Sequence, residues 1–277
     1  HLECSVMSTK YLGETFDIHG GGMDLKFPHH EAEIAQNKGC CHKGGANYWI
    51  HGNMLTVNGR KMAKSEGNGF TPEQLLTGDH KLLERGYSAM TVRFFMLMSH
   101  YASTLDFSNE ALQAAEKGYK RLMASVNLLE KLAKPGTASI DKAKTQELGD
   151  IVDKAMKDLS DDFNTAKAIA NLFELSTKIN TYYQQPSELA VIDPEVFEQV
   201  IERFKGIIFD VLGLRNEAEA AQDGKTLDSV MQVLIELRKQ AKFSKNYALS
   251  DKIRDDLKAA GIQLKDEKGG EMSYTIN

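Results

Sequence analysis

The chain has 277 residues, of which 42% are hydrophobic and 26% are charged, a composition that is ordinary for a globular protein. Its formal net charge of −5 argues against a protein that coats nucleic acid non-specifically, although a local basic face is compatible with it. No apolar run is long enough to span a bilayer, and three unevenly placed cysteines do not make a disulfide framework. We therefore expect no membrane partner and a reducing, cytoplasmic setting.

The two ends of the sequence bear on how much of a protein it represents. It begins at His1, without an initiator methionine, inside what reads as an element of structure, and its first residues do not form a signal peptide. Its length suggests two or three domains. We expect it to be a piece of a longer protein.

Residues 1–70 are rich in glycine, histidine and short β-like runs. The segment 16–22, FDIHGGG, predicts a strand that ends in a glycine turn. A helix is predicted to start at Pro28, in FPHHEAEIAQ, because proline suits the first helical position. The segment 47–62 predicts a strand, an Asn-Gly turn and a second short strand or loop. This alternation indicates part of an α/β domain.

The rest of the chain is predicted to be helical almost to its end, so the fold class is α/β followed by all-α. A helix should start at Thr71, just before a proline, in a connecting region over 71–109. Apolar residues at helical spacing predict a helical bundle over 110–213. The polar stretch 214–224 is predicted to be a linker, and 225–277 a small, mildly basic C-terminal domain with two helices.

The helix predicted at Pro28 carries metal-binding side chains on its first turn. His29 and Glu33 stand four residues apart and share one face of a helix, whereas His30 is displaced by about 100° and should point elsewhere. An imidazole and a carboxylate one turn apart are half of a metal site. The competing interpretation is a capped surface helix whose acidic residues favour the helix N-terminus.

A metal site needs more ligands, and the three cysteines are the candidates. Cys4, in HLECSVM, could come from a strand that neighbours the helix. Cys40 and Cys41 follow the helix by a few residues, and spacing alone does not choose among the three. A set of Cys, His and Glu is typical of a zinc site with an open or exchangeable position.

Two further motifs suit a nucleotide. The segment KMAKSEGN, residues 61–68, places two lysines three apart on a loop, where they can follow the charge of a triphosphate. In HGGGMD, residues 19–24, glycines allow close approach to a nucleotide and a carboxylate can hold ribose hydroxyls. Each motif alone is also compatible with an ordinary solvated loop or a tight turn.

In this order the motifs resemble the second half of the catalytic domain of cysteinyl-tRNA synthetases, which are class I aminoacyl-tRNA synthetases. The resemblance spans nearly all 277 residues. The matching pieces are HLECS, FDIHGGGMDLKFPHHEAEIAQ, NYWIHGNMLTVNGRKMAKSEGN, MTVRFFMLMSHY, DDFNTAKA and KNYALSDKIRDDLKAAGIQLKD. It implies the second half of a Rossmann-like nucleotide-binding domain over 1–70, a stem-contact region over 71–109, a helical bundle, and a C-terminal anticodon-side domain.

The resemblance also implies site residues. One zinc ion would be held by Cys4, His29, Glu33 and a cysteine that precedes this sequence, and His19 would lie near the bound amino acid. The lysine loop matches the family's KMSKS motif, with alanine in place of its first serine, so Lys61 and Lys64 are the implied catalytic residues. The implied ATP site consists of Lys64, Lys61, Ser65, Gly20, Gly21 and Asp24.

The implied reaction is the ligation of L-cysteine to tRNA(Cys) through an ATP-dependent cysteinyl adenylate, with Mg²⁺ accompanying ATP, in a monomeric enzyme. The family's HIGH motif and first zinc-binding cysteine are not in this sequence, so we expect the piece alone to be inactive. Two alternatives are a mycothiol-pathway cysteine ligase and a non-catalytic tRNA-binding fragment. The synthetase-like segment RKQAKFSKNYALSDKIRDDL argues against the first alternative.

The basic end of the chain is the predicted tRNA contact. Helical spacing groups Arg238, Lys242 and Lys245 on one side, where they could face phosphates. Phe243 and Tyr247 lie nearby and could stack on unpaired bases. The competing interpretation is a solvated amphipathic hairpin.

Overall fold

The computed structural model describes residues 1–136, 139–244, 246–266 and 272–276. The chain divides into two compact units, His1–Arg215 and Asn216–Asn277, which are described separately below. Among the described residues, none of the helices combines the length and the apolar character that crossing a membrane requires.

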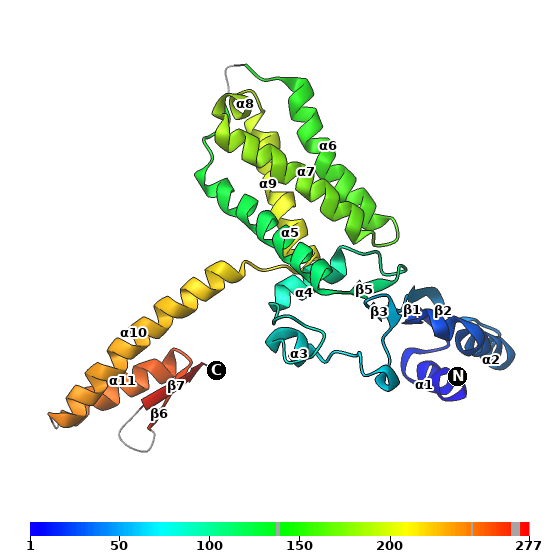
Figure 1. The fold of residues 1–277 in the computed structure, drawn as a ribbon, viewed down its shortest axis with the longest axis horizontal. Helices are drawn as coiled ribbons and strands as arrows, with labels where there is room; N and C mark the ends of the chain where they lie inside the picture. Colours follow the sequence, from blue (N-terminus) through cyan, green and yellow to red (C-terminus); the bar gives the residue numbers. More distant parts are fainter. Residues whose placement is uncertain (137–138, 245, 267–271, 277) are drawn as a thin grey trace. The chain divides into compact units, whose positions relative to one another are not determined.

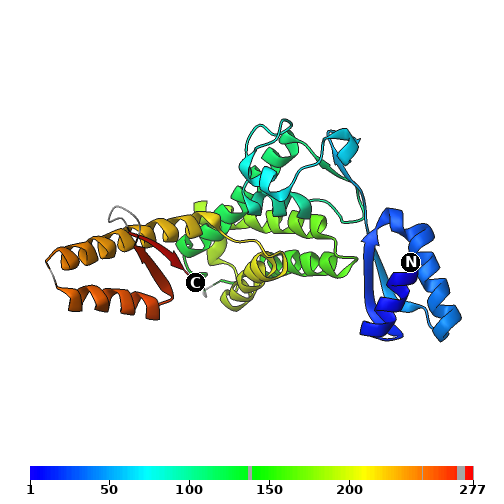
Figure 2. The same cartoon turned by 90° about the horizontal axis from the view of Figure 1, so that it is seen from below.

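The first unit starts with a small α/β module, residues 1–52. Its strands β1 and β2 are parallel and in register from Thr15 opposite Gly45 to Gly22 opposite Gly52. The helices α1 and α2 pack against each other and against the strands (Figures 1 and 2). The elements are α1 (Leu2–Leu12), β1 (Thr15–Gly22), the short turns η1 (Met23–Leu25) and η2 (Lys26–His30), α2 (Glu31–Cys41) and β2 (Gly45–Gly52).

Two local expectations for this module are wrong. Cys4 lies on α1 and not on a strand, and that helix has an acidic residue in its first turn and a basic one in its last, which suits the helix dipole. The α-helix that was expected to start at Pro28 starts at Glu31. The residues directly before Glu31 form the π-type turn η2, in which Phe27 has extended φ and ψ. The histidines therefore precede α2.

The middle of the first unit is a small mixed sheet with order β4-β3-β5, antiparallel between β3 and β4 and parallel between β3 and β5. The predicted Asn-Gly turn is confirmed, since Asn58 and Gly59 have φ of 51° and 74°, as a type I′ hairpin requires. The predicted helix start at Thr71 is also confirmed, by a complete capping box with Gln74. The elements are β3 (Leu55–Val57), β4 (Arg60–Lys61), η3 (Lys64–Glu66), α3 (Pro72–Thr77), α4 (Ala89–Leu97) and β5 (Leu105–Phe107).

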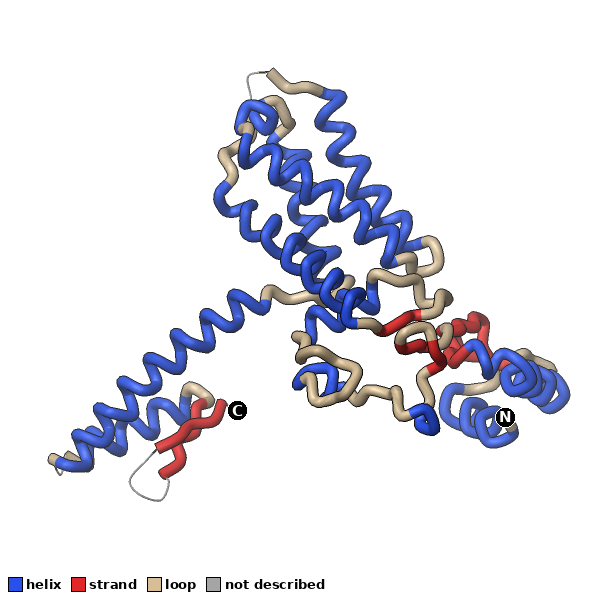
Figure 3. The backbone as a smooth tube through the Cα atoms, in the orientation of Figure 1, coloured by secondary structure: helices blue, strands red, loops and turns tan. Residues whose placement is uncertain are grey.

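The helical bundle that the apolar pattern predicted is the largest part of the unit (Figure 3). Its core consists of fully buried leucines, isoleucines and phenylalanines from every long helix, among them Leu122, Ile151, Leu175 and Phe204. The elements are α5 (Asn109–Leu128), η4 (Leu129–Lys131), α6 (Lys142–Ser160), α7 (Thr165–Gln184), α8 (Pro186–Ala190), α9 (Pro194–Gly206) and η5 (Ile207–Val211). Burial of this face, more than helix propensity, stabilises the bundle.

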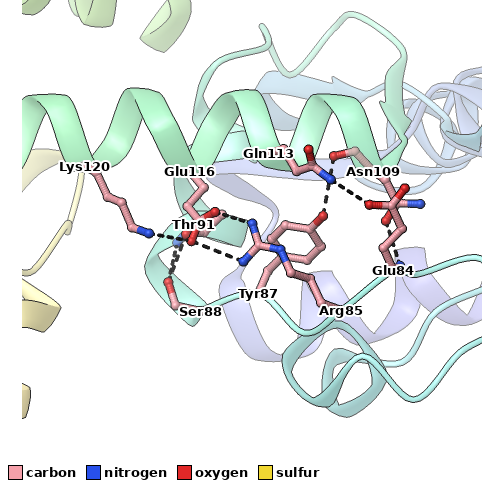
Figure 4. A network of polar contacts seen from close by, with 9 residues as sticks. All are labelled: Glu84, Arg85, Tyr87, Ser88, Thr91, Asn109, Gln113, Glu116 and Lys120. Atoms are coloured by element: carbon pink, nitrogen blue, oxygen red, sulfur yellow. Dashed lines mark hydrogen bonds and ion pairs between the residues drawn. The ribbon is translucent and has the colours of Figure 1, made fainter.

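A polar network attaches the segment before α4 to the first half of α5 (Figure 4). The Glu116 carboxylate accepts hydrogen bonds from Arg85 and from Lys120, the latter at 2.8 Å. These two donors lower the pKa of Glu116 to about 2, and Arg85 makes the larger contribution. The Asn109 side chain completes the attachment by accepting from the Glu84 amide at 3.0 Å.

The second unit contains α10 (Glu217–Phe243), α11 (Tyr247–Ala259) and an antiparallel pair, β6 (Ile262–Asp266) and β7 (Met272–Ile276). The stretch 214–224 was expected to be a linker, but it is helical from Glu217 onward. Its alanine, glutamate and glutamine residues are strong helix formers, which explains how a polar sequence continues directly into α10.

Candidate metal and nucleotide site

The carboxylate of Glu33 is the most unusual group of the α/β module. Its side chain is 1% exposed, and neither oxygen accepts a hydrogen bond from any residue that the structure describes. His29 Nε2 lies 3.1 Å from Oε1, but the pair does not have hydrogen-bond geometry. A buried carboxylate without donors is costly, so this arrangement calls for a cation.

Cys4 and His29 surround one side of this carboxylate. The three residues come from α1, η2 and α2, and one ligand atom of each lies within 4.8 Å of the others. The other two cysteines take no part in this group: Cys40 is exposed, and the pKa of the Cys41 thiol is raised, mainly by a hydrogen bond with Cys40. The structure thus brings together the three residues that the sequence proposed as ligands, although Cys4 reaches the site from a helix.

His19 and His30 surround the other side of Glu33, and sequence reasoning missed His30. His19 Nδ1 lies 3.6 Å from Oε2 of Glu33, and the three residues also offer ligand atoms within 4.8 Å of one another. His30 was expected to point away because a regular α-helix was assumed from Pro28. In the π-type turn it instead faces inward and is 3% exposed. The only sequence signal was the doubled histidine beside a proline.

Aromatic neighbours fix these two imidazoles. The Trp49 ring stacks on His19 with centroids 4.5 Å apart, and His30 Nδ1 lies 2.8 Å from His51 Nε2. Burial, followed by the charge of His19, lowers the pKa of His30. A Cβ at Gly21 would lie 2.6 Å from His30 Cε1, so the glycine there is required by packing against this ring.

The lysine loop lies between β4 and α3. Lys61 and Ser65 are exposed, and the backbone of Lys64 is in η3, while its side chain lies outside the described part of the structure. The buried Asn68 closes the loop: its Oδ1 accepts from the Ala63 amide at 2.9 Å, and its Nδ2 donates to the Lys61 carbonyl at 3.0 Å. No pattern in the sequence singles out this asparagine.

The remaining residues of the predicted nucleotide site lie at the carboxyl end of β1. Gly20 is exposed and has ordinary contacts, and Asp24 is exposed in η1. The carboxyl end of a parallel strand is where α/β sheets bind ligands.

The residues proposed to contact tRNA lie in the second unit and differ in how far they are exposed to solvent. Arg238 is 3% exposed, so it does not present its guanidinium on the surface as the spacing suggested. Lys242 is half-buried, and Lys245 lies outside the described residues. Phe243 and Tyr247 are 93% and 62% exposed, which leaves both rings available for stacking.

Comparison with curated proteins reveals close relatives. The chain is 49% identical over 271 residues to the cysteine--tRNA ligase of Cytophaga hutchinsonii, and 46% identical over 275 residues to that of Parabacteroides distasonis. Residues 1–117 match the family described as tRNA synthetases class I (C) catalytic domain, and residues 154–239 match the DALR domain. The chain belongs to the cysteine--tRNA ligase family.

The match covers nearly the whole chain but only part of each relative. It includes 98% of this chain in both cases. It includes 54% of the Cytophaga hutchinsonii ligase and 53% of the Parabacteroides distasonis ligase, so the chain spans about half their length. A solved ternary complex of Agrobacterium radiobacter K84 agnB2 LeuRS-tRNA-LeuAMS is 16% identical, with a TM-score of 0.49, and covers 72% of this chain and 28% of that chain.

Proposed function

We propose that the whole protein to which this chain belongs ligates L-cysteine to tRNA(Cys) through an ATP-dependent cysteinyl adenylate. The observation that carries the proposal is the buried carboxylate of Glu33, which has no hydrogen-bond donor among the described residues and lies beside a thiol and an imidazole. The relatives that share 98% of this chain are cysteine--tRNA ligases, which supports the same activity here.

The residues around Glu33 fit a zinc ion. Cys4, His29 and Glu33 supply the sulfur, nitrogen and oxygen donors that zinc accepts, and their mutual separations suit one ion. Bound zinc would select cysteine by accepting its thiolate as a ligand, which the hydroxyl of serine replaces poorly at neutral pH. An apolar pocket alone discriminates weakly between side chains of such similar size.

The chain's own residues then orient the reactants. His19, stacked on Trp49 beside Glu33, would line the position of the amino acid. Lys61 and Lys64 would neutralise the phosphates of ATP and Mg²⁺ would accompany them, while Ser65, Gly20, Gly21 and Asp24 would complete the nucleotide site. The adenylate forms when the cysteine carboxylate attacks the α-phosphate and pyrophosphate leaves; the acyl group then passes to the terminal adenosine of tRNA.

The second unit is the proposed contact with tRNA. Its exposed Phe243 and Tyr247 would stack on unpaired bases, and Lys242 would contribute a phosphate contact. The cytoplasmic setting and the monomeric state stay predictions.

A variant of the lysine loop tests the proposed function. In the whole protein, Lys64→Ala should slow cysteine-dependent ATP–pyrophosphate exchange about a hundredfold, or roughly 3 kcal/mol, since the lysine acts on charge that develops in the transition state. Cysteine binding, measured by calorimetry, should barely change. Lys43→Ala, which removes an exposed lysine paired with Glu14, is the matched control and should exchange at the unsubstituted rate. An unchanged rate in Lys64→Ala, or equal exchange with serine and cysteine, would contradict the proposal.

A further inference from the structure

Glu33 faces two separate groups of potential ligands through its two oxygens. Oε1 lies 3.1 Å from His29 Nε2, whereas Oε2 lies 3.6 Å from His19 Nδ1; Cys4 groups with His29 around Glu33, and His30 groups with His19. One zinc ion of tetrahedral geometry uses four ligand atoms, and Cys4 and His29 already accompany the first oxygen. The histidines on the second side are not needed for that ion.

We propose that Glu33 bridges two divalent cations, one at Cys4 and His29 and a second one at His19 and His30. This rests on the proposed zinc site for its first ion only. The second ion would have two imidazoles and a carboxylate oxygen, which is a ligand set that proteins use for zinc with an open fourth position.

The distances on both sides suit such a pair. Zinc–nitrogen and zinc–oxygen bonds of about 2.0–2.1 Å place two ligands of a tetrahedral ion roughly 3.3 Å apart. The measured separations, 3.1 Å on the side of His29 and 3.6 Å on the side of His19, both lie close to that value. Metal pairs joined by shared ligands stand about 3.5–4 Å apart, a spacing that the two oxygens of one carboxylate can span.

The second group is built as a site and is not an accidental meeting of surface side chains. His30 is 3% exposed, and its Nδ1 lies 2.8 Å from His51 Nε2, a contact that orients the ring. His19 is held by stacking on Trp49. Contacts between a histidine ring and neighbouring side chains commonly fix metal-binding histidines in place.

The two ions should not bind equally. The first has the thiolate of Cys4 as well as a share of Glu33, whereas the second has only neutral imidazoles and the other oxygen. Repulsion between two dications weakens whichever binds last. The second ion should therefore bind only at higher free metal, and, because it occupies His19, it should compete with the amino acid for the site.

Cobalt(II), which prefers the same ligands as zinc, distinguishes the two positions by their spectra. In the metal-free whole protein, the first equivalent of Co²⁺ should produce the near-ultraviolet band of thiolate-to-cobalt charge transfer. The second should add only the weaker visible bands of a nitrogen- and oxygen-bound ion. Metal analysis after equilibrium dialysis should reach two ions per chain.

Matched variants assign each ion. His19→Gln should lower the limit from two ions to one while keeping the charge-transfer band, and Cys4→Ser should lose the band but keep the histidine-bound ion. His42→Asn, at an exposed histidine outside both groups, is the control and should bind two. The His19 side chain is 20% exposed and is easier to replace than the buried His30, so His19→Gln is the decisive variant. Circular dichroism checks that this variant is folded.

The proposed function and the second ion fail separately. A limit of one ion with the band intact, or two ions in His19→Gln, would overturn the second site. Absence of the band in the unsubstituted protein would overturn the zinc site at Cys4 instead. A second ion that binds without weakening cysteine, as measured by calorimetry in excess Co²⁺, would overturn the expected competition at His19.

Discussion

The α/β module of residues 1–52 and the helical bundle have opposite interiors. The structure describes every residue of the module, and no apolar side chain of the module is buried. The buried side chains belong to Ser5, His30, Glu33 and Asn37. Its large apolar residues are instead mostly on the outside, among them Leu2, Val6, Tyr11, Phe27 and Tyr48. The bundle buries leucine, isoleucine and phenylalanine along every long helix.

Within this chain, which spans about half the length of its relatives, the buried side chains of the two regions make different kinds of contact. The bundle gains its stability from apolar surface removed from water. In the described module the buried side chains make polar contacts, such as the hydrogen bond from Ser5 Oγ to Gln36 Oε1 at 2.7 Å and the contact between His30 and His51. We therefore expect the bundle to be indifferent to metal and the module to depend on it. Trp49, the single tryptophan, reports on the module, and helical circular dichroism reports mainly on the bundle.

The largest effect should come from the bundle core. Leu175→Ala removes a side chain that is 0% exposed and should lower the free energy of unfolding by about 3 kcal/mol through lost burial and a cavity. Denaturation followed by circular dichroism measures this loss. Metal binding and the Trp49 transition should be unaffected. Met156→Ala, at a residue that is 38% exposed on α6, is the control and should cost much less. Loss of metal binding in Leu175→Ala would show that the regions are coupled.

A smaller and conditional effect should appear in the module. Zinc at a hundred times its dissociation constant should stabilise the Trp49 transition by about 2.7 kcal/mol, and Glu33→Gln should abolish that gain. With a chelator present, Glu33→Gln should be at least as stable as the unsubstituted protein, because a buried carboxylate without donors has been neutralised. Glu31→Gln, at an exposed residue of the same helical turn, should keep the zinc effect. A zinc effect that persists in Glu33→Gln would contradict the ligand assignment.

The smallest effect should come from the polar network at the edge of the bundle. Glu116→Gln should cost about 1 kcal/mol at pH 7, since Arg85 is half exposed and solvent screens the pair. The pKa of Glu116 is lowered from 4.5 to about 2, so its contribution is present above pH 4.5 and is lost as the pH falls toward 2. Urea denaturation at pH 7 and pH 3 should therefore give a smaller difference at the lower pH. Glu174→Gln, at an exposed glutamate of α7, should cost little at either pH.

The bundle was more predictable than the site because its signal is repeated. Leu112, Ala115, Tyr119 and Leu122 recur at helical spacing, and their burial follows from that spacing. His29 and Glu33 do lie side by side, 3.1 Å apart, as that spacing predicts, although His29 belongs to η2 and not to α2. Within the site, however, single turns decide the outcome.

Three misses share one physical origin. His30 faces inward because a π-type turn replaces the regular helix, Cys4 lies on a helix, and Arg238 is buried. None of these outcomes is contained in local residue spacing, because each depends on which surface the neighbouring element presents. The closure of the lysine loop by Asn68 is a similar case, since an asparagine five residues after its partner has many alternatives.

For the proposed binding of ATP at this loop, that closure has a consequence in conformational entropy. Because one buried side chain bonds the backbone at both Lys61 and Ala63, these two positions are held before any nucleotide arrives. Fixing a backbone residue costs about 1–2 kcal/mol, so a disordered loop of this length would lose much of its attraction for phosphate in becoming ordered. A loop that is already held at two positions would lose less of that attraction on binding ATP.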